Sequence, residues 1–358
     1  MLVNAVLFTL GLIALIAGAR TLVRGASKLA LSLGISPLVV GLTVVAFGTS
    51  APEVAVSVGA ALDGRTEMAV GNVLGSNIFN VLFILGLSAL ILPLVVNAQL
   101  IRQEVPIMIG ASLLLVVLAI DGRIGRPESA LLLVLLVVYT VFLIVQSRRQ
   151  TQQTRDEYAE AAPPDRAWDR HWAMQVALVA AGLALLVFGS NWLVDASIAF
   201  ARAFGVSELV IALTIVAAGT SMPEVATSVT AALKGERDIA VGNVVGSNTF
   251  NLLGCVGVSG LVTSGGLPVP PAALAFDVWV MLAAAFACLP VFVSGREIAR
   301  WEGGLFVGYY FAYTAFLVLA ARHHQALPAF SAVMVSFVAP LTIVTLLVSV
   351  LRTQRGMR

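Results

Sequence analysis

Apolar segments long enough to cross a lipid bilayer, which takes about 20 residues, make up almost the whole chain. Eleven can be read, at approximately 2–29, 35–62, 68–92, 97–119, 128–147, 173–201, 206–233, 239–263, 271–293, 300–321 and 328–351. Only 11% of the 358 residues are charged, against about 25% in a typical soluble domain, and the mean hydropathy is +0.98. We therefore expect an all-α polytopic membrane protein that lies in a lipid bilayer and does not bind nucleic acid.

The one extended polar segment, 148–171, separates the fifth span from the sixth and reads as a solvated linker. If this linker is cytoplasmic, alternation of the spans puts sixteen of the 21 Lys and Arg residues on the cytoplasmic side, as the positive-inside rule requires. We therefore expect the N-terminus outside and the C-terminus inside. The lack of a large cytoplasmic domain favours the inner membrane of a bacterium or archaeon.

An internal repeat relates the two halves of the chain without any gap, at an offset of 171 residues. Between 41–80 and 212–251, 27 of 40 positions are identical. Each copy holds five spans, and an odd number means that the second copy enters the membrane from the opposite side. Such inverted-topology repeats are typical of secondary transporters, whose substrate site lies near the bilayer midplane. The predicted organisation is a first repeat (1–147), the cytoplasmic linker (148–171), a second repeat (172–322), and an additional C-terminal helix and tail (323–358).

Polar residues dominate the part of the repeat that matches best. The stretch "AFGTSAPEVAVS" at 46–57 returns as "AAGTSMPEVATS" at 217–228. Spacings of three and four residues put its polar side chains on one helical face. Pro52 and Pro223 each remove a backbone donor and clash with the carbonyl four residues earlier, near Gly48 and Gly219, so that carbonyl is expected to be free to face a ligand. This face carries Ala46, Thr49, Ser50, Glu53 and Ser57 in the first stretch, and Ala217, Thr220, Ser221, Glu224 and Ser228 in the second.

A second repeated motif follows in the third and eighth spans, as "GNVLGSNIFN" at 71–80 and "GNVVGSNTFN" at 242–251. Amides and hydroxyls recur every four residues and form one stripe on each helix. The stripes are Asn72, Ser76 and Asn80 in the first copy, and Asn243, Ser247 and Asn251 in the second. Glycines spaced by four in the same motifs allow close helix packing.

All these groups are hard oxygen donors of the kind that Ca²⁺ and Na⁺ bind, and no thiolate or imidazole cluster accompanies them. A carboxylate at the bilayer centre costs about 2.5–3.5 kcal/mol on insertion scales. Neither motif contains Lys or Arg, so cations or protons must offset Glu53 and Glu224. One alternative is a pair of protonated glutamates that act only as structural glue. We expect no cofactor and no enzymatic activity, because the apolar core lacks His and any HExxH or GxGD motif.

The paired motifs "GTSxPE" and "GNVxGSNxFN" resemble the α-repeats of the cation/Ca²⁺ antiporter superfamily, and most of all its prokaryotic sodium/calcium exchanger branch. The resemblance covers about residues 5–320. It implies a ten-helix exchanger core around clustered Na⁺ and Ca²⁺ sites, and a first and a sixth helix that slide to give alternating access. By motif position the ligands would be Glu53, Glu224, Thr49, Ser50, Thr220, Ser221, Ser76, Ser247, Asn80 and Asn251, with the carbonyls of Ala46 and Ala217.

This chain departs from the superfamily pattern in two ways. Some members carry Asp at one of the positions that Asn80 and Asn251 fill here, and an eleventh helix exceeds the usual ten. The leading hypothesis is a Na⁺/Ca²⁺ antiporter whose partners are these inorganic cations. A proton/cation antiporter on the same scaffold is the nearest alternative, and a cation channel is a more distant one. No oligomeric state is predicted.

Overall fold

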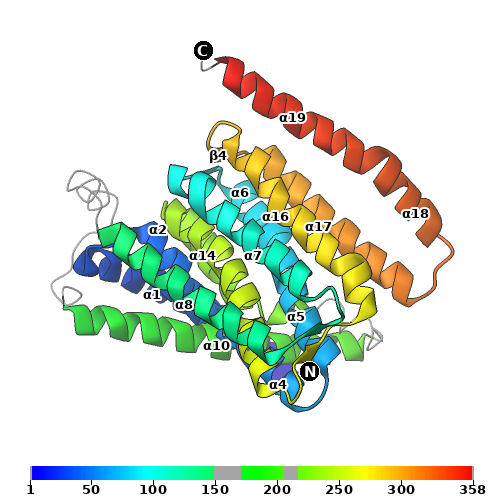
Figure 1. Ribbon diagram of the computed structural model, residues 1–358. Helices are drawn as coiled ribbons and strands as arrows, with labels where there is room; N and C mark the ends of the chain where they lie inside the picture. The colour runs from blue at the N-terminus through cyan, green and yellow to red at the C-terminus, as the bar shows by residue number, and fades with distance from the viewer. Residues whose placement is uncertain (1, 149–170, 205–216, 357–358) are drawn as a thin grey trace.

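The computed structural model describes residues 2–148, 171–204 and 217–356, which fold almost entirely into helices (Figure 1). The helices are α1 (Leu2–Leu33), α2 (Pro37–Val40), α3 (Ala46–Thr49), α4 (Ala51–Leu62), α5 (Thr66–Ile78), α6 (Gly86–Ile91), α7 (Val105–Leu118), α8 (Arg126–Arg148), α10 (Trp172–Ala203), α12 (Ala217–Gly219), α13 (Met222–Leu233), α14 (Arg237–Phe250), α15 (Val256–Val262), α16 (Val278–Val293), α17 (Arg300–Ala321), α18 (Leu327–Val333) and α19 (Ala339–Gly356). π-Helical segments adjoin several of them: η1 (Gly41–Val45), η2 (Phe79–Leu85), η3 (Leu100–Glu104), η6 (Asn251–Cys255), η7 (Ala273–Asp277) and η8 (Met334–Val338).

The predicted spans correspond closely to these helices. Within the described residues, nine continuous helices are long and apolar enough to cross a membrane, and the bent pair Pro37–Thr49 and Ala51–Leu62 makes a tenth. The all-α polytopic prediction is thus confirmed. Of the predicted seventh span, 206–233, the structure describes residues 217–233. The predicted linker lies outside the described residues except at its ends.

Two short strand pairs, which the sequence did not predict, connect loops of opposite halves. Strand β1 (Leu94–Val95) pairs antiparallel with β4 (Glu297–Ile298), and β2 (Arg123–Ile124) pairs antiparallel with β3 (Leu267–Pro268). The first pair joins the loop after the third expected span to the loop after the ninth. The second pair joins the loops after the fourth and the eighth. Both intervals hold an even number of spans, so each pair lies on one side of the membrane, as the inverted repeat requires.

Helices α1 and α10, the first helix of each repeat, pack against each other along one flank of the bundle (Figure 1). Glycines line this contact on both sides. A Cβ on Gly18 would lie 2.9 Å from the carbonyl oxygen of Gly182, and one on Gly182 would lie 2.6 Å from the backbone nitrogen of Leu22. No side chain larger than hydrogen fits there without a shift of backbone. This close approach is what small residues permit in membrane helices.

The interior of the bundle is built from the third and eighth spans, which carry the amide motifs. In the most apolar stretch of Arg237–Val262, 94% of residues are buried, and 72% in that of Thr66–Ile91. In Arg300–Ala321 the figure is 6%. A membrane helix that carries repeated Asn and Ser has to be enclosed by protein, because lipid cannot satisfy these groups.

The additional C-terminal helix predicted beyond the repeats is present as α18, η8 and α19, with an apolar span over Leu327–Leu347. It lies on the flank opposite α1 and α10 (Figure 1). It packs against α16 and α17, and the Tyr309 hydroxyl of α17 donates to the Thr342 hydroxyl at 2.7 Å. The helix therefore covers the outside of the second repeat and makes no part of the buried polar interior.

Replacing Gly182 by Ala should force α1 and α10 apart, because the new methyl group meets backbone rather than a flexible side chain. We expect a loss of about 1–3 kcal/mol in the free energy of unfolding, as for other overpacked sites. Gly308→Ala in α17 is the matched control, since nothing lies within 4 Å of a Cβ there. That control should be neutral or stabilise by up to about 1 kcal/mol through helix propensity. Thermal unfolding in detergent measures both, and equal midpoints for the two variants would contradict the packing argument.

Candidate cation site

Both proline motifs break their helix in the middle of the bundle. Ser50 (φ −79°, ψ 5°) separates α3 from α4, whose axes differ by 44°, and Ser221 (φ −88°, ψ 10°) stands at the start of α13 in the same way. Each break places a glutamate in the first turn of the new helix, Glu53 in α4 and Glu224 in α13. A helix N-terminus carries partial positive charge from its unpaired N–H groups. The break therefore gives each buried carboxylate a favourable electrostatic position.

Each glutamate is held by a serine from the opposite repeat. Ser221 donates to Oε1 of Glu53 at 2.7 Å, and Ser50 donates to Oε1 of Glu224 at 3.1 Å. Both glutamates are fully buried, and the Oε2 atom of each has no partner among the described residues. The two bonds are reciprocal, because each serine lies three residues before the glutamate of its own repeat. Two buried carboxyl groups, each with one oxygen to which no described residue bonds, thus meet at the interface of the repeats.

Asn72 and Asn243 hold the broken helices in place. Asn72 donates to the Ser57 hydroxyl at 3.0 Å and to the Glu53 carbonyl at 3.2 Å, while its own oxygen accepts from Thr220 at 3.4 Å. Asn243 makes the same three bonds in the second copy. It donates to the Ser228 hydroxyl at 2.9 Å and to the Glu224 carbonyl at 3.5 Å, and its oxygen accepts from the Thr49 hydroxyl at 3.1 Å. Both amides thus lie among the polar groups of the site, as the stripe predicted. Their hydrogen bonds connect each broken helix to the following span and to the threonine of the opposite repeat.

The other predicted side chains lie in the same buried cluster. The hydroxyls of Ser76 and Ser221 lie 3.3 Å apart, within hydrogen-bond distance, whereas the hydroxyl of Ser247, the repeat equivalent of Ser76, has no partner among the described residues. Asn80 and Asn251 lie in η2 and η6, π-helical segments at equivalent positions of the two repeats. π-Helical turns inside α-helices occur frequently at functional sites. Ser76, Ser247 and both asparagines are at most 1% exposed.

The proline break does not leave the Ala46 carbonyl without a partner. Its oxygen accepts from the backbone N–H of Ser50 at 3.0 Å and from the Thr49 hydroxyl at 3.4 Å. Ala217 begins α12, directly after residues that are not described. In the second repeat, the carbonyl of Gly219 accepts a hydrogen bond from Ser190 of α10 at 2.7 Å. To bind a cation, the Ala46 carbonyl would therefore have to give up one of these two hydrogen bonds, of which the one from Thr49 is the longer.

Two further asparagines that were not predicted belong to the cluster, Asn77 and Asn248. Asn80 donates to Oδ1 of Asn248 at 3.0 Å, and Asn248 donates to the backbone carbonyl of Asn77 at 3.2 Å. Both residues lie off the four-residue stripe, so helical periodicity did not indicate them. Their identity in both copies of "GSNxFN" was the signal that could have found them.

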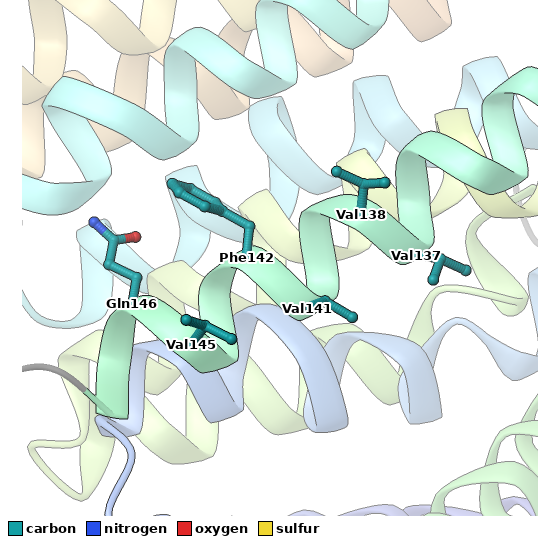
Figure 2. Close-up of a pocket in the computed structure, with 6 residues that line it drawn as sticks. All are labelled: Val137, Val138, Val141, Phe142, Val145 and Gln146. Carbon is teal, nitrogen blue, oxygen red and sulfur yellow. The ribbon is translucent and has the colours of Figure 1, made fainter.

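This donor set suits a hard cation. It consists of two carboxylates with hydroxyl and amide oxygens. Within the described residues, no Lys or Arg interacts with either carboxylate. In the same part of the chain, no group of three or more His, Cys, Asp or Glu could hold a metal ion. The surface hollow drawn in Figure 2 lacks the oxygen donors of this site. Its lining residues all belong to α8 and are Val137, Val138, Val141, Phe142, Val145 and Gln146. That apolar lining offers a cation no charge.

The amino-acid sequence matches the family model described as "Sodium/calcium exchanger protein" over residues 3–145 and 174–319. A putative antiporter, CaxA, from Alkalimonas amylolytica is 40% identical over 86% of this chain and 98% of its own length. The inner membrane protein YrbG of Escherichia coli is 37% identical over 79% of this chain and 86% of its own. The sodium/calcium exchanger MaX1 of Methanosarcina acetivorans is 32% identical over 88% of this chain and 98% of its own.

A solved structure of the sodium-calcium exchanger NCX_Mj, soaked with 10 mM Na⁺ and no Ca²⁺, has the same fold. It superposes with a TM-score of 0.74 at 29% identity and covers 88% of this chain and 98% of its own. A second structure of that exchanger, soaked with Na⁺ and Ca²⁺, gives a TM-score of 0.75. The family model covers both repeats.

Asn243→Ala should destabilise the protein by roughly 1–3 kcal/mol, because it removes the partner of the buried Ser228 hydroxyl and the closer of the two acceptors of the buried Thr49 hydroxyl. Ser88→Ala is the matched control, since the Ser88 hydroxyl is buried and already unpartnered. The control should be neutral or slightly stabilising. Thermal unfolding in detergent without Ca²⁺ compares the two, and a control that loses as much stability as Asn243→Ala would refute the bracing role.

Proposed function

The chain belongs to the sodium/calcium exchanger family, whose members are membrane antiporters of Ca²⁺ and other cations and not enzymes, and on that premise we propose that it exports Ca²⁺ in exchange for Na⁺. One observation carries the proposal. Glu53 and Glu224 are fully buried, and within the described part of the chain one oxygen of each carboxylate has no protein partner and no basic residue interacts with either group. Cations of the transported kind are the natural counter-charge.

Shared ligands explain how the two ions would be coupled. The free oxygens of both glutamates would bind Ca²⁺, which takes six to eight oxygen ligands, with Thr49, Ser50, Thr220, Ser221, Ser76, Ser247, Asn80, Asn251 and the carbonyls of Ala46 and Ala217 as further donors. Na⁺ would occupy the same carboxylates. Neither ion set could then remain while the other fills the site, and the empty, doubly charged site would oppose reorientation. The inward Na⁺ gradient would drive Ca²⁺ out.

The names of the relatives support sodium as the coupling ion. MaX1 is named a sodium/calcium exchanger, and the NCX_Mj structures are described as states of extracellular ion exchange with Na⁺ and Ca²⁺ or Sr²⁺. Alternating access would use the glycine-lined contact of α1 and α10, which presents two smooth surfaces to each other. Rocking or sliding of one repeat unit against a fixed site is the general pattern for inverted repeats.

We further propose an inner-membrane location, with the N-terminus outside and the linker 148–171 in the cytoplasm. The bias of Lys and Arg toward one side supports this orientation. The E. coli relative is named an inner membrane protein. In this orientation the β1–β4 pair faces the cytoplasm and the β2–β3 pair faces outward.

In proteoliposomes loaded with Na⁺ and diluted into Na⁺-free buffer with Ca²⁺, the protein should accumulate Ca²⁺. Glu53→Gln and Glu224→Gln should each lower this uptake at least about 100-fold. Each variant keeps only one buried carboxylate, and a single negative charge does not balance the divalent ion. Radioactive Ca²⁺ uptake provides the measurement. Glu67→Gln, which alters an exposed carboxylate in the first turn of α5, is the matched control and should transport normally.

The ion gradients are then varied one at a time. Uptake that follows an imposed pH gradient and ignores Na⁺ would make the protein a proton/cation antiporter instead. Uptake that persists in both Gln variants would refute the shared-carboxylate site altogether. Flux that fails to accumulate Ca²⁺ against its gradient would indicate a channel.

Single cysteines placed in paired loops test the orientation. Asp121→Cys lies in the loop before β2, and Ser294→Cys in the loop before β4. Because both native cysteines are buried, background labelling should be low. A membrane-impermeant maleimide added to intact cells should label Asp121→Cys and should reach Ser294→Cys only after lysis. The reverse pattern would invert the proposed topology.

A further inference from the structure

A chain of three asparagines from the two repeats runs through the candidate site, and one of its ends is a backbone carbonyl. The carbonyl oxygen of Asn77 can only accept, so Asn248 must turn its amide N–H₂ toward it, at 3.2 Å. The side-chain oxygen of Asn248 then points the other way. It accepts from the amide N–H₂ of Asn80 at 3.0 Å.

The orientation of Asn80 follows from this order. With its N–H₂ committed to Asn248, its oxygen is the remaining polar atom, and that oxygen is fully buried and has no partner in residues 2–148, 171–204 and 217–356. Buried polar atoms in native proteins are rarely left unpaired, and an exception calls for an absent ion, water or ligand. A free amide could rotate to present its N–H₂ instead, which would repel a cation. Asn248 removes that freedom.

The equivalent chain in the second repeat is not formed. By the 171-residue offset, Asn251 would donate to the side-chain oxygen of Asn77, but both of these atoms are buried and without partners. The oxygen of Asn251 accepts instead from the thiol of Cys255 at 3.3 Å, and the amide of Asn77 donates to Val73 in its own helix at 2.7 Å. Cys255 corresponds to Ile84, which has no polar group, in the first repeat.

We propose that Asn248 is a positioning residue for cation binding, which turns the oxygen of Asn80 toward the transported ion. The inference rests on the proposed function. It concerns a residue of the second repeat that acts on a ligand of the first, so it couples the two halves through the site. Asn77 supplies the anchor through its backbone, and its side chain has no part in it.

A double-mutant cycle on Asn248 and Asn80 tests the proposal, with the external Ca²⁺ concentration for half-maximal uptake as the readout. Asn248→Ala should raise this concentration about three- to tenfold, the loss expected for one hydrogen bond. Asn80→Ala should raise it by at least as much. In the double variant, the loss at Asn248 should disappear, because an absent amide cannot be positioned. A purely structural role would instead multiply the two effects.

Ser88→Ala is the control, since it removes a buried hydroxyl that has no partner among the described residues and takes no part in the asparagine chain. We expect less than about a twofold change in that concentration, and no coupling to Asn80→Ala. An effect as large as that of Asn248→Ala, or multiplicative effects in the cycle, would overturn the proposal. Because Asn248 also bonds to the other repeat, Asn248→Ala will lower stability. Asn248→Ser replaces it in the cycle if the alanine variant does not fold.

The wild-type protein separates this inference from the proposed function. If it does not accumulate Ca²⁺ on a Na⁺ gradient, the proposed function fails before the cycle is measured. If it does accumulate Ca²⁺ and the two substitutions act independently, the positioning role alone is refuted.

Discussion

Two buried carboxylates that meet without a basic partner are the constraint on which the rest of this structure depends. A lone charge at membrane depth is costly, and two like charges add their repulsion. The protein lowers that cost by placing Glu53 and Glu224 at helix N-termini and giving each a serine from the other repeat. One oxygen of each carboxylate still has no partner. The fold thus leaves a deficit of positive charge that a small cation can supply, and the surrounding helices have to bury it completely.

The inverted repeat is the economical solution to this constraint. One half supplies one carboxylate on a broken helix, and its copy, entering from the other side, supplies the second at the same depth. Each broken helix is then braced by an amide of the following span, through Asn72 and Asn243, which also reach the threonine of the opposite half. Neither half could hold its glutamate alone, since the serine that bonds to it belongs to the other. The strand pairs tie the same two halves at both membrane surfaces.

The amino-acid sequence predicted the spans, the repeat and the polar residues that lie together, because hydropathy and the 171-residue offset report on them directly. It could not show whether the serine of a motif bonds to the glutamate of its own repeat or to that of the other repeat. Spacing places Ser50 and Glu53 on one face of a helix, yet Ser50 bonds to Glu224, and that choice depends on how the two repeats dock. The partners of the Ala46 carbonyl depend on the geometry of the break at Ser50. The strand pairs are two residues long, too short for a period-two pattern, and their partners are far apart in the sequence.

The two copies carry nearly the same residues at the site but do not make the same bonds. Ser76 and Asn80 of the first repeat are bonded to the second, whereas Ser247 and Asn251 make no corresponding bond to the first. Identical motifs can therefore exist in two bonding states at once. An antiporter built from inverted repeats needs this property, because exchanging the states of the two halves turns one orientation into the other. Cys255, which has no polar counterpart in the first repeat, makes the exchange inexact. The two orientations then need not bind a cation equally well.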